Sequence, residues 1–374
     1  MDSVAQRRLV ADACARLRPH IGNPRLDEFA QVCVNQLAPL LDHETRAHLQ
    51  RYVLAALTGL GVLELYLADP GVTEVAVNAG REVWVDRNGA MERVDSVEPH
   101  EVALLIERMI SPLGLRFDLT SPVVDARLPG GQRLCAVREP LAVDGTCLSI
   151  RRFALQHVSL AAFAPPPVAR LVQQLVEARC NLVVSGATST GKTTLLNAIA
   201  TLFDAGERII TIEDTAELSI GAPHVVRLEA RPATPDGVEA VTVRQLLHAA
   251  LRLRPDRLVI GEVRGAEAFD MVQALNTGHD GSLSTVHANS APDALRRISS
   301  LAALGAPGQS RESLDEQVRS SIDAVIHLAR RPDGSRYIAA VEEVCVPDTS
   351  GPATSPLTTE CEVIAEPTRW RRST

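Results

Sequence analysis

One segment of the sequence has the residue types and spacing of a phosphate-binding loop. Residues 186–193 read GATSTGKT, which fits the pattern G-x-x-x-x-G-K-[ST] in full. Glycines let the backbone curl so that its N–H groups point at phosphate oxygens, and the following helix presents its positive N-terminus to the same anion. An apolar run precedes the loop and an apolar-periodic helix follows it, so a fortuitous turn is the weaker alternative. The residues expected to bind a nucleotide are Gly186, Ala187, Thr188, Ser189, Thr190, Gly191, Lys192, Thr193 and Thr194.

Lysine occurs at one position of this loop and nowhere else in the chain. Of 38 lysines and arginines, Lys192 is the single lysine. Its compact ammonium suits the space between β- and γ-phosphates, whereas a planar guanidinium is broader. The Thr193 hydroxyl is expected to bind Mg²⁺. The sequence therefore predicts ATP and Mg²⁺ as ligands of the loop.

Carboxylates follow two apolar runs that read as strands. The run RIITI leads into Glu213, and the run LVIG leads into Glu262. Because the carboxyl ends of strands face the ligand crevice in open α/β sheets, both carboxylates should converge on the phosphates. Glu262 is the better candidate for polarising water; Glu213 could do likewise or bind Mg²⁺ through water. Structural ion pairs at strand ends are the alternative, and the nearby loop makes them the less favoured one.

Two histidines bracket the short run SLSTV. His279 and His287 lie in a segment dense in small polar residues, close in sequence to the Glu262 strand. An imidazole can donate to phosphate or water and change partner as charge leaves, so this segment is a candidate sensor of the γ-phosphate. A metal site is less favoured because there is no cysteine or third histidine nearby in the sequence.

The chain divides into four regions by pattern. Residues 1–60 are helical in pattern, and residues 61–157 alternate short β runs with turns and one helix, as in a small α+β domain. Residues 158–346 alternate strands and helices, which implies an α/β sheet covered by helices. Residues 347–374 are rich in Pro, Ser and Thr and are expected to be disordered. Within the third region we expect strands at 181–185, 208–212, 225–228, 258–263 and 283–287, helices at 192–202 and 266–277, and a hairpin of 324–329 with 337–345.

Bulk composition excludes several classes of protein. With 374 residues and 45% hydrophobic residues the chain can bury a core, so wholesale disorder is excluded. A net charge of −8 and 3% aromatic residues argue against a nucleic-acid-coating role. The longest apolar stretch, 53–63, is too short to span a bilayer, and the N-terminus lacks a signal-peptide core. The sequence predicts a cytoplasmic protein with membrane contact only through partners.

Four motifs in order resemble those of the secretion-superfamily ATPases, the motors of type II and type IV secretion and of type IV pili. They are the phosphate loop, the acidic box ITIEDTAEL (210–218), the segment LRLRPDRLVIGEVRG (251–265) and the histidine box GHDGSLSTVHANSA (278–291). The resemblance covers roughly residues 55–346. The upstream wording, including LPGGQR and SIRRF, is most similar to the CpaF/TadA branch, which powers tight-adherence (Flp-type) pilus assembly.

This resemblance implies a RecA-like ATPase domain preceded by a small PAS-like α+β domain, assembled as a homohexamer. It implies inner-membrane platform proteins as partners. The net charge of −8 and the few aromatic residues predict no direct contact with nucleic acid. It also implies arginines that reach the γ-phosphate, at positions matched here by Arg133 and Arg151. A surface or salt-bridged role remains equally open for each, since Arg127 and Arg152 lie close by.

The function expected on this basis is a hexameric ATP-driven motor for pilus assembly or type II/IV-like secretion, at the cytoplasmic face of the inner membrane. A conjugation-type type IV motor that moves DNA or protein is the alternative, and a RecA-like nucleic-acid motor is less favoured. A non-enzymatic nucleotide-binding scaffold would require that the carboxylates of Glu213 and Glu262 take no part in hydrolysis. The tetracysteine insertion usual in the type II branch is absent from the sequence, as is the Ala-Ile-Arg-x-Gly-Glu segment of retraction motors.

The single lysine allows a direct chemical test of the loop. A lysine-specific acylating reagent can modify only Lys192 and the chain's N-terminal amine. We expect ATP to protect Lys192 from acylation and leave the N-terminal amine reactive, because the bound phosphates contact the lysine side chain and shield it. Peptide mass spectrometry would report the two sites separately, and equal labelling of Lys192 with and without ATP would contradict the assignment.

Overall fold

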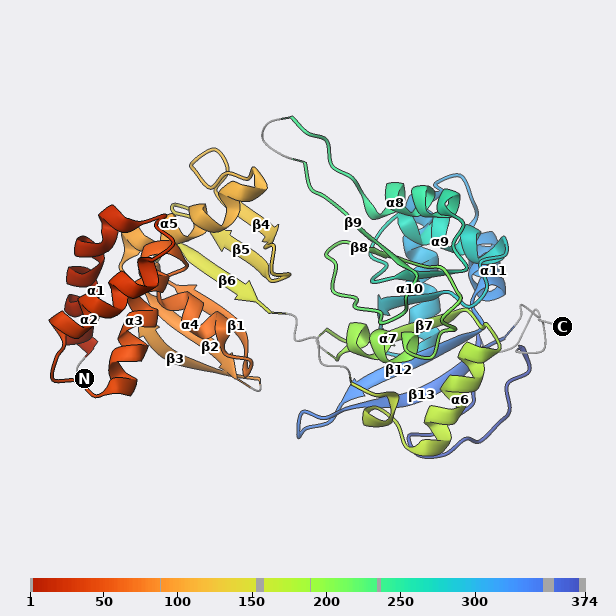
Figure 1. The fold of residues 1–374 in the computed structure, drawn as a ribbon. Helices are drawn as coiled ribbons and strands as arrows, with labels where there is room; N and C mark the ends of the chain where they lie inside the picture. Colours follow the sequence, from red (N-terminus) through yellow and green to blue (C-terminus); the bar gives the residue numbers. More distant parts are fainter. Residues whose placement is uncertain are drawn as a thin grey trace. The chain divides into compact units, whose positions relative to one another are not determined.

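The computed structural model describes residues 3–87, 89–152, 158–188, 190–233, 237–345 and 353–369. The chain forms two compact units, Met1–Ala154 and Leu155–Thr374, and each is described by itself (Figure 1). Within these described ranges, short 3-10 helices lie at Arg18–His20, Ser111–Leu113, Leu160–Ala162 and Leu251–Leu253.

The first unit begins with a three-helix bundle, as the helical pattern predicts. Its helices are α1 (Ser3–Leu17), α2 (Leu26–Leu37) and α3 (His43–Thr58), packed around a core that includes Val34 and Val53. Asp42 caps α3 by accepting a hydrogen bond from the Thr45 amide at 2.8 Å. Among the described residues no single helix is long and apolar enough to cross a bilayer. Only α3 and α4 (Val62–Ala68) taken together meet that length and composition, and they are bent by 113° at their junction.

An antiparallel sheet completes the first unit. Its six strands run in the order β3-β2-β1-β6-β5-β4, and α5 (Pro99–Ile110) packs its apolar side on the sheet. A capping box formed by Glu98 and Glu101 starts α5. The strands are β1 (Val72–Asn78), β2 (Glu82–Arg87), β3 (Ala90–Ser96), β4 (Val123–Arg127), β5 (Arg133–Val137) and β6 (Cys147–Arg151).

The second unit is built on a mixed eight-stranded sheet of order β14-β13-β12-β7-β11-β10-β8-β9. The strands from β12 to β9 in this order pair in parallel, while β13 and β14 add antiparallel strands at one side. Their bounds are β7 (Leu182–Gly186), β8 (Ile209–Glu213), β9 (Val225–Glu229), β10 (Arg257–Ile260), β11 (Leu283–His287), β12 (Ala324–Arg330), β13 (Arg336–Val344) and β14 (Thr354–Pro356). The predicted strands and closing hairpin are confirmed, with boundaries shifted by a few residues.

Helices cover both faces of this sheet, because its strands are apolar on both sides. Leu182 and Val184 face a core shared with α6 (Pro166–Glu177) and α7 (Lys192–Ala200). Val183 faces the other core, formed with α8 (Val243–Ala250), α9 (Glu267–Asn276), α10 (Ala291–Gly305) and α11 (Arg311–Ser321). This three-layer arrangement confirms the predicted α/β class of fold.

The C-terminal segment differs from the expectation of a disordered tail over residues 347–374. Among those residues, β14 pairs with β13, and Leu357 is 1% exposed. Arg369 is buried and donates to the carbonyls of Ile322 and Val344, while Glu343 accepts from the Arg369 amide. The prediction is wrong for residues 353–369, because polar side chains there are bonded to the sheet rather than to water. Residues 347–352 and 370–374 lie outside the described ranges.

The Arg369 contact predicts a strong effect of its removal on stability. Arg369→Ala would leave the Asp323 carboxylate, 17% exposed in its side chain, without this ion pair and several carbonyls without a donor. We expect the free energy of unfolding to fall by about 3 kcal/mol, measured by urea denaturation. The control Arg296→Ala removes an exposed pair with Asp293 and should cost less than about 1 kcal/mol. Equally small losses of unfolding free energy in both variants would contradict a stabilising role for Arg369.

Candidate active site

The phosphate loop connects β7 to α7 in the second unit. Gly191, the last residue before α7, has φ +92°, a conformation that strains any residue with a Cβ. The Thr190 hydroxyl donates to the Ala187 carbonyl at 2.8 Å and so closes the loop on itself. Thr193 and Thr194 lie in the first turn of α7, whose unpaired N–H groups suit an anion. Ser189 lies outside the described residues.

Lys192 is buried at the centre of this loop. Its side chain is directed at the loop's own carbonyls, with Nζ 3.2 Å from Gly186 O and 3.1 Å from Ala187 O. Nζ is also 3.1 Å from Nδ1 of His287. Burial lowers the pKa of the Lys192 ammonium below its usual value, and the nearby Glu262 carboxylate opposes that shift. The lysine is thus placed to exchange these partners for phosphate oxygens.

His287 connects the lysine to Glu262. An ammonium only donates, so Nδ1 of His287 accepts from Lys192 and the proton lies on Nε2. Nε2 is 2.6 Å from Glu262 Oε1, although Oε1 has no donor in hydrogen-bond geometry within the described part of the chain. The contact is therefore close but poorly aligned. Burial, followed by the charge of Lys192, lowers the pKa of His287, which favours this neutral imidazole.

Parallel strand register produces these contacts. His287 is the register partner of Gly186, and Ile260 is the partner of Ile212. Glu262, just past β10, and Glu213, at the end of β8, are thereby brought to the same edge of the sheet as the loop. Of these groups, His287 contacts Lys192 and Glu262 contacts His287, while Glu213 lies at the same edge two strands along the sheet from β11. That both carboxylates act on the phosphates stays a prediction.

Arg264 is a further member of the site that the sequence analysis did not assign. Its Nη2 donates to Glu262 Oε2 at 2.6 Å, and its Nη1 lies 3.8 Å from Asp214 Oδ2. The two oxygens of Glu262 therefore face different partners, Arg264 and His287. In the sequence, Arg264 stands two positions after Glu262, which could have indicated this contact. In an arginine-rich chain, however, such spacing is common.

Glu213 occupies a drier environment than Glu262. It is 3% exposed, and its Oε1 accepts hydrogen bonds from the Glu217 and Leu218 amides, both at 2.9 Å. Its Oε2 is buried and has no hydrogen-bond partner in the described structure. Burial raises the pKa of Glu213 to about 7, against the lowering effect of those two amides. Glu213 can thus hold or release a proton near neutral pH.

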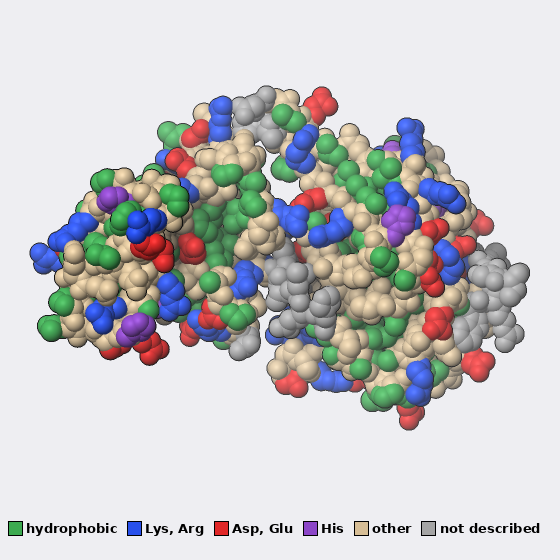
Figure 2. All heavy atoms as spheres, in the orientation of Figure 1, with side chains coloured by type: hydrophobic (Ala, Val, Ile, Leu, Met, Phe, Trp, Pro, Cys, Tyr) green, Lys and Arg blue, Asp and Glu red, His purple; other side chains and the backbone are tan. Residues whose placement is uncertain are grey.

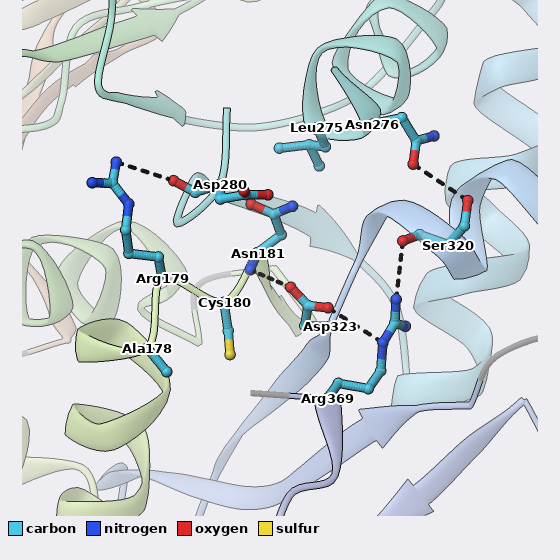
Figure 3. A pocket seen from close by; sticks show the side chains of 10 residues that line it. All are labelled: Ala178, Arg179, Cys180, Asn181, Leu275, Asn276, Asp280, Ser320, Asp323 and Arg369. Atoms are coloured by element: carbon cyan, nitrogen blue, oxygen red, sulfur yellow. Dashed lines mark hydrogen bonds and ion pairs between the residues drawn. The ribbon is translucent and has the colours of Figure 1, made fainter. Parts of the chain in front are cut away.

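His279 is not brought to the loop, so the expectation that it binds the nucleotide is wrong for this unit. It lies before β11, at the opposite end of that strand from His287, and its Nδ1 contacts the Ala274 carbonyl at 3.1 Å. The physical reason is length, since β11 separates the two imidazoles along the strand. A cavity of about 190 Å³ also lies at this opposite edge, lined by residues that include Asn181, Asp280 and Arg369 (Figure 3). It is remote from the loop chemistry, and its Arg369–Asp323 pair is structural.

Arg133 and Arg151 belong to the first unit. They are register partners on β5 and β6, and Arg127 on β4 is the register partner of Arg133. Directly paired residues share a face, so three arginines form one cross-strand row. Arg133 binds Asp125 through an ion pair of 2.6 Å, and Arg151 is exposed. Their approach to a γ-phosphate stays a prediction.

The donor set of the second unit fits a nucleoside triphosphate with Mg²⁺. A buried ammonium, a helix N-terminus and a glycine in the left-handed region form an anion site. The Thr193 hydroxyl and the unpartnered Glu213 Oε2 are oxygen ligands of the kind that Mg²⁺ prefers. Fold and site together define a phosphate-loop nucleotide-binding unit.

Comparison with known proteins identifies the family. Residues 56–361 match the profile of the type II/IV secretion system protein family, so the chain belongs to that family. A Mycobacterium tuberculosis protein, named provisionally as a conjugal transfer protein, is 42% identical over 313 residues, covering 80% of this chain and 88% of the relative. The conjugal transfer protein TrbB of Rhizobium radiobacter is 31% identical, with coverage of 72% and 83%. The type IV secretion system protein PtlH of Bordetella pertussis is 33% identical, with coverage of 73% and 89%.

Solved structures share the fold. The pilus retraction motor PilT matches with a TM-score of 0.59 and 21% identity, covering 78% of this chain and 83% of that chain. The ATPase DotB of Legionella pneumophila matches with a TM-score of 0.51 and 18% identity, covering 76% and 80%. At these identities the likeness concerns the fold.

The environment of Glu213 predicts a pH dependence of stability. Its folded pKa of about 7 lies above the ordinary value of 4.5, so between these pH values the native state binds more protons than the unfolded state. Below about pH 4.5 this group makes its full contribution to the free energy of unfolding. As pH rises that free energy falls, and above pH 7 the total loss reaches up to about 3 kcal/mol. In Glu213→Gln this loss should vanish, which urea denaturation at pH 5 and pH 8 would measure.

The matched control for this measurement is Glu177→Gln, at an exposed position on α6. It should keep the pH dependence of the wild-type chain. A Glu213→Gln variant with the same slope as wild type would show that Glu213 is ionised in the folded state throughout this range.

Proposed function

We propose that the chain is an ATP-hydrolysing motor of a type IV secretion machine. The observation that carries this proposal is the unbroken series of contacts from Lys192 through His287 to Glu262 at the mouth of the phosphate loop. It joins the group expected to hold the β- and γ-phosphates to the carboxylate expected to polarise water. A protein that only binds nucleotide would not need the Glu262 carboxylate, because no water has to be polarised.

The chemistry follows from what each side chain can hold. Lys192 and the N–H groups of the loop and α7 bind the phosphates, and Glu262 orients water and accepts its proton. When bound through Thr193 and Glu213, Mg²⁺ neutralises charge on the phosphate oxygens. A γ-phosphate competes with His287 for the ammonium, so the imidazole responds directly to its presence and absence.

Glu262 must also be released from its present partners to act as a base. Arg264 holds one of its oxygens and His287 faces the other. Because Arg264 is 58% exposed in its side chain and reaches toward Asp214, it can move between the two carboxylates. We infer that this exchange sets when Glu262 can accept a proton.

The relatives favour the conjugation-type alternative over the pilus-assembly function expected first. Relatives named for conjugal transfer and for type IV secretion each cover more than 70% of the chain at 30% identity or above. We therefore propose DNA or protein transport through a type IV channel as the activity served by hydrolysis. Pilus assembly is the second candidate, supported by the resemblance of the upstream segment to the CpaF/TadA branch.

The assembly and location are part of the proposal. We infer a homohexamer that acts peripherally at the cytoplasmic face of the inner membrane through platform proteins. In it, Arg133 and Arg151 donate to the γ-phosphate, since a guanidinium fork stabilises charge on a transferring phosphoryl group. On the face that Figure 2 displays, acidic and basic side chains are interspersed on each unit.

Two substitutions separate nucleotide binding from hydrolysis. Lys192→Ala should abolish ATPase activity by removing the phosphate ligand, and Glu262→Gln should lower kcat at least about 100-fold while ATP still binds. Phosphate release and isothermal titration calorimetry measure the two properties, with the exposed Glu177→Gln as control. Wild-type-like turnover in Glu262→Gln would contradict its role as the base.

The proteins that bind the ATP-bound chain identify the secretion machine in which it works. Crosslinking and affinity purification of the Glu262→Gln variant from its own cells, in ATP, should recover components of a conjugation or type IV channel. Recovery of pilin-assembly platform proteins instead would favour the second candidate. DNA-stimulated hydrolysis by the isolated chain would support a nucleic-acid motor and contradict transport through protein partners.

A further inference from the structure

The hairpin of β12 and β13 runs alongside the phosphate loop. β12 pairs in parallel with β7 as far as His327 opposite Ser185, so the residues that follow His327 pass the start of the loop. A Cβ at Gly186 would lie 2.6 Å from the Leu328 carbonyl oxygen, which shows how closely the two backbones approach. In the sheet, β7 has β12 on one side and β11, which carries His287, on the other. The hairpin therefore flanks the loop on the side away from His287 and Glu262.

Arg336 lies against the last glycine of the loop. It is the first residue of β13 and is exposed. A Cβ at Gly191 would lie 2.8 Å from Arg336 Cδ and 2.9 Å from its Nη1. Gly191 directly precedes Lys192 and the N-terminus of α7, where the phosphates are expected. The guanidinium of Arg336 is thus adjacent to the anion site although it is far from the loop in sequence.

Arg330, Arg331 and Asp333 of this turn make structural contacts. Arg330, the register partner of Arg336, donates to the Gly334 carbonyl at 3.2 Å. Arg331 pairs with Glu360 and lies over the Tyr337 ring. Asp333 accepts hydrogen bonds from the amide and hydroxyl of Ser335, which lower its pKa. Three arginines and one aspartate leave the turn cationic beside a site for phosphates.

We propose that Arg336 binds the α- or β-phosphate of the nucleotide and so completes the phosphate site from the side opposite His287. The inference rests on the proposed nucleotide binding by the loop and adds a second cation from the same unit. A guanidinium presents a planar fork of donors that matches phosphate oxygens. Because these phosphates are present in both ATP and ADP, Arg336 contributes equally to the binding of substrate and product.

The experiment measures the binding of ATP and of ADP, each with Mg²⁺, by calorimetry in the Glu262→Gln background, where ATP is preserved. Arg336→Ala should weaken both ligands about 10-fold, because hydrogen bonds to charged groups are among the stronger ones. Arg336→Lys should restore part of the affinity. In the otherwise wild-type chain, Arg336→Ala should raise KM for ATP and leave kcat within about twofold.

Arg330→Ala is the matched control, since it removes an arginine from the partner strand of the same turn. It should keep wild-type affinity, and thermal unfolding of both alanine variants checks that each remains folded. Unchanged affinity in Arg336→Ala, or equal losses in both alanine variants, would overturn the proposal. Failure of the Glu262→Gln chain with native Arg336 to bind either nucleotide would overturn the proposed function and this inference with it. Normal binding there with no effect of Arg336 would overturn only the inference.

Discussion

The charge of Lys192 must be buried and partnered at the same time, and much of the second unit is arranged around that requirement. A desolvated ammonium is costly unless polar groups replace its water. Here the replacements are the Gly186 and Ala187 carbonyls and the His287 imidazole. Two of these come from the loop itself, and the third depends on β11 pairing with β7 in one register. A slip of one residue would turn His287 to the other face and leave the ammonium without it.

The same register separates the properties of the two glutamates. Glu262 lies among charged and polar neighbours, with Arg264 and His287 at its oxygens. Glu213 is enclosed by β8 and the chain that follows it, and burial raises its pKa to about 7. Two carboxylates at one edge of a sheet therefore lie in different environments, one polar and one buried. Such a division is a recurring way for one site to combine a base with a group that holds a proton or a metal.

One side of the mixed sheet is shaped by segments distant in sequence. The segment that contains β14 adds to β13, and Arg369 fastens the chain to the carbonyls that end α11 and β13. The turn between β12 and β13 carries Arg336 to Gly191. In the first unit, strand pairing likewise aligns Arg127, Arg133 and Arg151 although turns separate them in the chain. Cationic groups are therefore gathered by β pairing rather than by local sequence.

The sequence by itself determined the phosphate loop, the strand-end acids and the alternation of strands and helices, because each is encoded within a few residues by spacing and apolar pattern. It also predicted that Glu213 and Glu262 would lie at the edge of the sheet that faces the ligand, since parallel strands share an edge for their carboxyl ends. Only the tertiary structure separated His279 from His287, because the direction of β11 decides which end reaches the loop. Only it placed Arg264 and Arg336, whose roles depend on contacts in three dimensions that an arginine-rich sequence does not distinguish. Composition suggested disorder for residues 347–374. A buried guanidinium and a paired strand nevertheless hold residues 353–369, because hydrogen bonds to a distant sheet outweigh a polar local composition.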